Sequence, residues 1–101
     1  MKFEKDTITT RYMSQPLKHS GCVSYPFGIY KTRNGWKLAH IPQERDIWWE
    51  AYPTLKEAKS RLAEALKVVP LSNWDRDKHP FDGVPVETIN DLRDVLKVGA
   101  A

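Results

Sequence analysis

The chain has 101 residues, a formal net charge of +3 and a single cysteine, which suits one small domain. It contains no run of about 18 apolar residues, so no membrane span is expected. The polar N-terminus shows no signal-peptide core, and one cysteine excludes an intramolecular disulfide. We therefore expect a cytoplasmic protein with one modest hydrophobic core.

The first part of the chain, residues 1–22, is polar and shows little periodicity. Within it, residues 7–13 alternate in polarity and include β-branched side chains. This segment is predicted either as an extra edge strand or as an arm that orders only on a partner, and the alternation slightly favours the strand. Residues 23–101 are predicted to form a single α+β domain.

A β-hairpin is predicted around Asn34-Gly35, because this pair separates two runs rich in strand-forming residues. Two registers are open. A two-residue loop at Asn34-Gly35 divides the apolar side chains into two groups on opposite faces. These groups are Tyr30, Ala39 and Ile41, and Ile29, Trp36 and Leu38. A turn over residues 32–35, with Gly35 as a left-handed bulge, instead places two like charges, Lys31 and Lys37, opposite each other.

The aromatic run of residues 47–52 is predicted as a third strand. Side chains alternate between the two faces of a strand, so Trp48 and Trp49 cannot both lie under one helix. Trp49 is in phase with Ile47 on the more apolar face, and we expect it in the core. Trp48 shares its face with Glu50 on the more polar side, and we expect it on a binding surface.

Two amphipathic helices are predicted after the strands. A Thr-x-x-Glu capping box opens the first helix over residues 54–69, and Pro70 ends it. The second helix is predicted over residues 86–98, and Trp74 and Phe81 are expected to pin the long connection between the helices. The predicted fold class is α+β, with an antiparallel sheet of three or four strands, one helix packed on it, and a second C-terminal helix.

Residue types that form catalytic and metal sites are few in this chain. A nucleophilic enzyme needs an activated cysteine or serine beside a positioned histidine, and no such motif surrounds Cys22 or His40. A zinc site would need nearly all the histidines and the cysteine, of which only His19-x-x-Cys22 has ligand-like spacing. No glycine-rich phosphate loop occurs. We therefore expect no enzymatic activity, no metal and no cofactor.

Basic and aromatic residues gather on the predicted sheet, where basic side chains suit phosphates and tryptophans suit stacking on bases. The candidate contact residues are Lys31, Arg33, Trp36, Lys37, Arg45 and Trp48. A rival interpretation is that the C-terminal helix or the N-terminal segment covers this face, which would place both adjacent tryptophans in the core. The C-terminal helix needs an apolar surface for its own stripe, and this need favours the rival.

Three motifs together carry a family resemblance: Asn34-Gly35-Trp36-Lys37 at the first turn, the aromatic run 48–52, and the helix opening 54–59. They resemble the three-stranded-sheet-plus-helix DNA-binding module at the N-termini of phage-type tyrosine integrases, which is similar in shape to the plant AP2 domain. The resemblance spans residues 28–66. It implies that the open sheet face enters the major groove and that Arg33, Trp36 and Lys37 contact DNA.

Two functions of different kinds fit this pattern. A compact chain with four tryptophans also looks like the small accessory proteins of phages and mobile elements. The first expectation is a non-enzymatic binding protein of this type that contacts DNA through a basic, aromatic sheet face. The alternative is a modulator or inhibitor that docks on a host nucleic-acid-processing enzyme through aromatic anchors.

Overall fold

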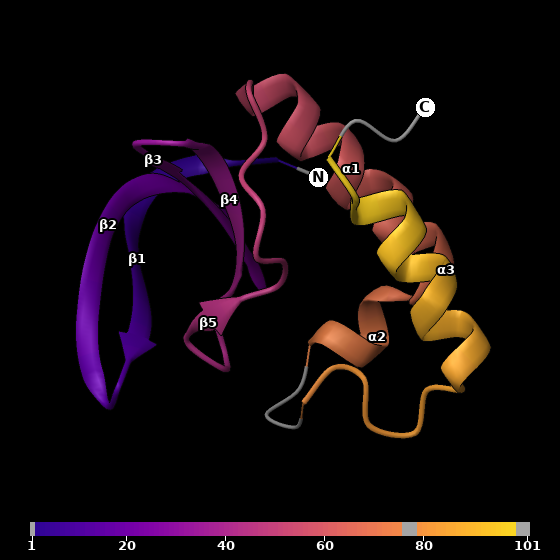
Figure 1. The fold of residues 1–101 in the computed structure, drawn as a ribbon. Helices are drawn as coiled ribbons and strands as arrows, with labels where there is room; N and C mark the ends of the chain where they lie inside the picture. Colours follow the sequence, from indigo (N-terminus) through magenta and orange to yellow (C-terminus); the bar gives the residue numbers. More distant parts are fainter. Residues whose placement is uncertain (1, 76–78, 99–101) are drawn as a thin grey trace.

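The computed structural model describes residues 2–75 and 79–98, in which a curled antiparallel sheet packs against helices (Figure 1). The strands are β1 (Glu4–Tyr12), β2 (Gln15–Ser24), β3 (Phe27–Thr32), β4 (Gly35–His40) and β5 (Arg45–Asp46). The helices are α1 (Leu55–Val68), α2 (Leu71–Trp74) and α3 (Val86–Leu96). The α+β class is confirmed, whereas the sheet has five strands in place of the three or four predicted.

The N-terminal segment is a strand, as the alternation favoured, but it belongs to a long hairpin. β1 and β2 pair from Glu4↔Val23 to Tyr12↔Gln15. The turn at Met13-Ser14 has φ values of 50° and 66°, the left-handed conformations that match the twist of a tight hairpin. β2 was not predicted, because half of its residues are exposed and the strand shows no alternation. It also crosses the expected boundary after residue 22.

The sheet curls so far that β1 returns to the far end of the strand order. The Arg11 backbone N–H donates to the Glu44 carbonyl at 2.8 Å, and the two side chains form an ion pair at 2.9 Å. Ile8 packs over two glycines, Gly21 and Gly28, where an added Cβ would lie 2.8 Å from the Ile8 Cδ1 atom. The two glycines therefore allow the close approach that buries Ile8 inside the curl, on what we call the inner face.

The hairpin of β3 and β4 forms where it was predicted, but in neither of the two registers. Thr32 pairs with Gly35, so the loop is Arg33-Asn34. The division of side chains between the faces nevertheless agrees with the first register. Ile29, Trp36 and Leu38 lie on the face that carries the helices, and Tyr30 and Ala39 lie on the inner face.

The predicted third strand is wrong over most of its length. β5 is only two residues long, and the chain rejoins the sheet at Tyr52, which exchanges backbone hydrogen bonds of 2.7 and 2.8 Å with Trp36. The Ile47 N–H still donates to the Leu38 carbonyl at 2.9 Å, and residues 48–51 then bulge out of the sheet. Gly35 lies against the rejoining segment with φ 130°, where a Cβ would be 2.3 Å from the Tyr52 carbonyl oxygen. A glycine is needed there for its φ and for its lack of a side chain.

Short-range sequence signals predicted the positions of the two longer helices, α1 and α3. The Thr54 hydroxyl caps α1 by accepting the Glu57 N–H at 3.0 Å, as the capping box predicted. α3 ends two residues before the predicted end at 98. The short helix α2 was not predicted, but it lies in the connection that Trp74 was expected to pin, and Trp74 is fully buried.

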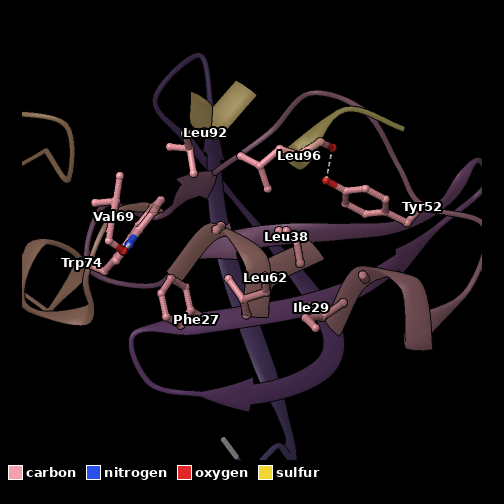
Figure 2. Packing of buried hydrophobic residues seen from close by; sticks show 11 residues of the cluster. Phe27, Ile29, Leu38, Tyr52, Leu62, Val69, Trp74, Leu92 and Leu96 are labelled. Atoms are coloured by element: carbon pink, nitrogen blue, oxygen red, sulfur yellow. Dashed lines mark hydrogen bonds between the residues drawn. The ribbon is translucent and has the colours of Figure 1, made fainter. Parts of the chain in front are cut away.

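The main core lies between the sheet and the helices (Figure 2). Its buried members are Phe27, Ile29, Leu38, Tyr52, Ala58, Leu62, Ala65, Val69, Trp74, Leu92 and Leu96. Burying each large apolar side chain contributes about 1.5–3 kcal/mol. Two polar atoms of this core are satisfied by backbone carbonyls: the Tyr52 hydroxyl donates to Leu96, and Trp74 Nε1 donates to Val69. The helices thus cover one face of the sheet, and β1 closes over the other, in partial agreement with the rival interpretation.

Candidate functional site

The six candidate contact residues do not share one surface. Lys31, Arg33, Trp36 and Lys37 lie at the end of the β3–β4 hairpin, Arg45 lies in β5, and Trp48 lies in the bulged segment. Lys31 pairs with Trp36 on the helix-covered face, whereas Lys37 pairs with Tyr30 on the inner face. The hairpin end therefore carries four of the six residues, divided between its two sides.

On the helix-covered side, the hairpin end borders an open hollow of about 560 Å³, which we call the lysine hollow. Its lining residues are Lys5, Asp6, Thr7, Ser20, Gly21, Cys22, Lys31, Trp36 and Leu55. The Lys31 Nζ atom lies 5.8 Å from the centroid of the Trp36 ring, within cation–π range. Pockets that take small molecules have volumes of about 300–1,000 Å³, so the hollow is large enough for a ligand group.

Positive charge dominates the lysine hollow. Lys5 and Lys31 line it, and Lys59 lies close enough for its charge to act on the neighbouring Cys22 thiol. Within the described part of the chain, none of these three lysines forms an ion pair. Asp6 is the one carboxylate among the lining residues. The hollow therefore suits an anionic group.

On the inner side, the hairpin end borders a second hollow of about 420 Å³, which we call the Trp49 hollow. Its lining residues are Thr32, Asn34, Lys37, Trp49, Glu50 and Ala51. The Lys37 ammonium forms an ion pair with Asp46 at 3.0 Å, so its charge is largely compensated. The Trp49 hollow is therefore polar but less basic than the lysine hollow.

The two adjacent tryptophans lie opposite to their predicted environments. Trp49, expected in the core, is 73% exposed, whereas Trp48, expected on the surface, is half-buried and packs against the main core. Alternation between faces does not apply to them, because residues 48–51 leave the sheet. Trp48 Nε1 donates to the Glu50 carboxylate at 3.2 Å, and the same oxygen accepts the Val98 N–H at 3.3 Å. Glu50 thus holds Trp48 inward, while Trp49 faces solvent.

A chain of polar contacts crosses the inner face and uses one residue from each strand. Thr10 and His19 share a hydrogen bond at 2.9 Å, and the His19 ring stacks on Tyr30 with centroids 4.0 Å apart. The Tyr30 hydroxyl donates to Asp46 at 2.7 Å, and Asp46 pairs with Lys37. Burial raises the pKa of Tyr30, and the bond to Asp46 raises it further, so the phenol stays protonated as a donor. This series of contacts fixes the position of the Lys37 side chain at the hairpin end.

The groups considered for catalysis have structural partners. The Cys22 thiol donates to the Ile29 carbonyl at 3.8 Å, and burial raises the pKa of this thiol, with Lys59 opposing the shift. His40 is buried and its Nε2 atom donates to the Trp74 carbonyl at 2.6 Å. In residues 2–75 and 79–98, no group of three or more metal-ligating side chains comes together.

Three further residues belong to the candidate site but were not predicted. Lys59 lies one helical turn after Leu55, which lines the hollow, and its charge acts on the Cys22 thiol, so the predicted helix already contained the signal for a cation beside the hollow. Lys5 is brought there by the unpredicted pairing of β1 with β2, and Trp49 by the bulge. In contrast, Arg45 lines a small cavity of about 30 Å³ with other neighbours, away from both hollows.

We call Lys31, Arg33, Trp36, Lys37 and Trp49 together the hairpin-end surface. None of the helices in the described ranges is long and apolar enough to cross a bilayer. No family model matches the chain, and no curated protein or solved structure matches it at a significant level. The resemblance to integrase DNA-binding modules accordingly stays a prediction, and the hairpin-end surface with its two hollows is the basis for a functional assignment.

Proposed function

We propose that this chain is a non-enzymatic nucleic-acid-binding protein, of the phage or mobile-element accessory type, that contacts its ligand through the hairpin-end surface. The observation that carries the proposal is the exposure of Trp49, 73% of whose surface is open to solvent beside a polar hollow. A tryptophan buries about 150–250 Å² when it is enclosed. Leaving Trp49 exposed therefore forgoes roughly 3 kcal/mol of hydrophobic stabilisation, which a stacked base would recover.

The distribution of charge around the hairpin end supports the same ligand. Lys5, Lys31 and Arg33 are exposed, and none of them forms an ion pair with a described carboxylate. Uncompensated cations beside aromatic rings are what a phosphate backbone with accessible bases requires. Lys37 contributes less, because Asp46 already neutralises it.

The salt dependence of binding tests this proposal. We expect a fluorescently labelled oligonucleotide to bind with an affinity that falls as salt rises, with a slope of roughly −0.7 to −0.9 per phosphate contact. Lys31→Ala and Arg33→Ala should each flatten that slope. Lys67→Ala is the matched control, because Lys67 is an exposed lysine in the last turn of α1, at the other end of the helix from the lysine hollow. No binding at low salt, or an equal effect of all three variants, would contradict the proposal.

Docking on a host nucleic-acid-processing enzyme is a second candidate function, and a separate surface favours it. At the tip of the β1–β2 hairpin, Tyr12, Met13 and Leu17 are 67%, 81% and 45% exposed. Exposed apolar side chains of this kind suit a protein interface better than a phosphate backbone. A pull-down from cell extract with and without nuclease separates the two functions. A stoichiometric protein that survives nuclease and is lost with Tyr12→Ala would support docking.

A further inference from the structure

The covered sheet limits the forms of nucleic acid that the hairpin end can contact. α1 and α3 lie over one face, and β1 curls across the other and is tied to the loop before β5 by Arg11 and Glu44 (Figure 1). Neither face of β3 and β4, the strands whose hairpin the integrase resemblance assigns to DNA contact, is therefore open in the described part of the chain. The surface that remains is a tight turn with a hollow on each side.

Both hollows are concave, and each contains one tryptophan ring. Trp36 lines the lysine hollow of about 560 Å³, and Trp49 lines the Trp49 hollow of about 420 Å³. A base inside a duplex has both of its faces covered by neighbouring base pairs, so it cannot stack on a protein ring without leaving the helix. An unpaired base has a free face. A tryptophan ring that lines a hollow can therefore stack on an unpaired base but not on a base inside an intact duplex.

Polar groups at the hairpin end lie both in the two hollows and at the turn between them. Arg33 is exposed at the turn that separates them, where its guanidinium can bind a phosphate. In the Trp49 hollow, the Asn34 side chain offers both a donor and an acceptor for a base edge. In the lysine hollow, the hydroxyls of Thr7 and Ser20 and the ammonium of Lys5 line the walls.

We propose that the hairpin end binds single-stranded nucleic acid, with one unpaired base in each hollow and the intervening phosphate on Arg33. This inference rests on the proposed function and specifies its ligand. The Lys31 side chain is exposed, and its ammonium is near the outer limit of a cation–π contact with Trp36, so it can move to a phosphate when a base enters. DNA and RNA single strands share the required chemistry.

The test compares matched ligands with the full chain. Affinity is measured by fluorescence anisotropy for a mixed-sequence strand of about 12 nucleotides, as DNA and as RNA, and for the same DNA strand hybridised to its complement. We expect either single strand to bind at least about ten-fold more tightly than the duplex. A duplex that binds equally or more tightly would overturn this inference and leave the proposed function intact. Absence of binding to every ligand would overturn the proposed function itself.

A second measurement locates the bases. Trp49→Ala should weaken single-strand binding by about ten-fold or more, while Trp49→Phe should retain most of the affinity because a stacking face remains. Tyr12→Ala is the matched control, since Tyr12 is also an exposed aromatic residue but lies on the β1–β2 hairpin. Circular dichroism of each variant confirms that it is folded. Unchanged single-strand affinity in a folded Trp49→Ala variant would overturn the placement of a base in the Trp49 hollow and, with it, the inference.

Discussion

At the scale of single residues, Trp48 and Trp49 provide a direct comparison of two neighbours in different environments. Trp48 packs against the main core, so Trp48→Ala should lower the free energy of unfolding by about 2–3 kcal/mol, somewhat less than for a fully buried tryptophan. Trp49 is 73% exposed, so Trp49→Ala should change the free energy of unfolding by less than about 0.5 kcal/mol. Urea unfolding of the two variants measures this difference. Equal destabilisation would show that Trp49 is also part of the core.

A buried histidine makes stability depend on pH. His40 is 2% exposed, and burial lowers its pKa below the ordinary value of 6.5; the bond to the Trp74 carbonyl opposes this shift, and His79 adds to it. With Nε2 donating, the Nδ1 atom is an acceptor that has no partner among the described residues. Between the folded pKa and 6.5, the unfolded chain binds more protons than the folded one, so stability falls as the pH drops through this window.

We therefore expect the melting temperature of the native chain to decrease from about pH 7 to pH 5, where each pH unit is worth at most about 1.4 kcal/mol. His40→Gln should flatten this dependence, because glutamine does not titrate but can still donate an N–H to Trp74. Scanning calorimetry at several pH values provides the comparison. An identical pH dependence in both proteins would assign the effect to another group.

At the scale of elements, the helices were predictable because their signals lie within a few residues of one another. The capping box at Thr54 and the apolar stripe after it need no information from the rest of the chain. The strands could not all be predicted from such local signals. Half of the residues of β2 are exposed, and this strand shows no alternation. Residues 48–51 bulge between two backbone attachments to β4, at Ile47 and at Tyr52. Pairing of that kind depends on distant segments, which a local pattern does not contain.

The turn of the β3–β4 hairpin also depends on a distant segment, because Gly35 lies against Tyr52. The contribution of this contact to stability can be tested. Gly35 has φ 130°, and an added Cβ would lie 2.3 Å from the Tyr52 carbonyl oxygen. Gly83 also has a positive φ, 80°, but open space around it. Gly83→Ala should cost about 1–2 kcal/mol from backbone strain alone. Gly35→Ala should cost at least about 2 kcal/mol more in urea unfolding, because the Trp36–Tyr52 bridge must also shift. Similar losses would mean that the bridge adapts at little cost.

At the scale of the whole molecule, the candidate site was only partly predictable. Lys31, Arg33, Trp36 and Lys37 came together because they lie in one hairpin, and a local turn is enough to join them. Arg45 and Trp48 were assigned through a long third strand that does not form. Lys5 lines the lysine hollow and Lys59 lies near its Cys22 side only because the β1–β2 hairpin and α1 meet at one end of the sheet.

The compactness of the fold, with a radius of gyration of 12.8 Å, indicates that the N-terminal hairpin is part of the same body as the helices. Ile8 is fully buried in the curl, so Ile8→Ala should destabilise the chain by about 2–5 kcal/mol. Because unfolding should be cooperative, tryptophan fluorescence and far-UV circular dichroism should report the same loss. Met13→Ala, at an 81% exposed position in the same hairpin, is the control. A loss seen by circular dichroism alone would identify the hairpin as a separately unfolding unit.

The carboxylate of Glu50 has a consequence for communication across the molecule. It joins the segment that carries Trp49 to the backbone just beyond α3 through its bond to the Val98 N–H. Any ligand that orders Trp49 should therefore also restrain that backbone. By reciprocity, loosening that backbone should lower the affinity for the ligand. Hydrogen exchange at the Val98 amide should slow when the hairpin end is occupied, and it should lose that response in Glu50→Ala. The backbone just beyond α3 would then act as a remote reporter of ligand binding at the β3–β4 hairpin end.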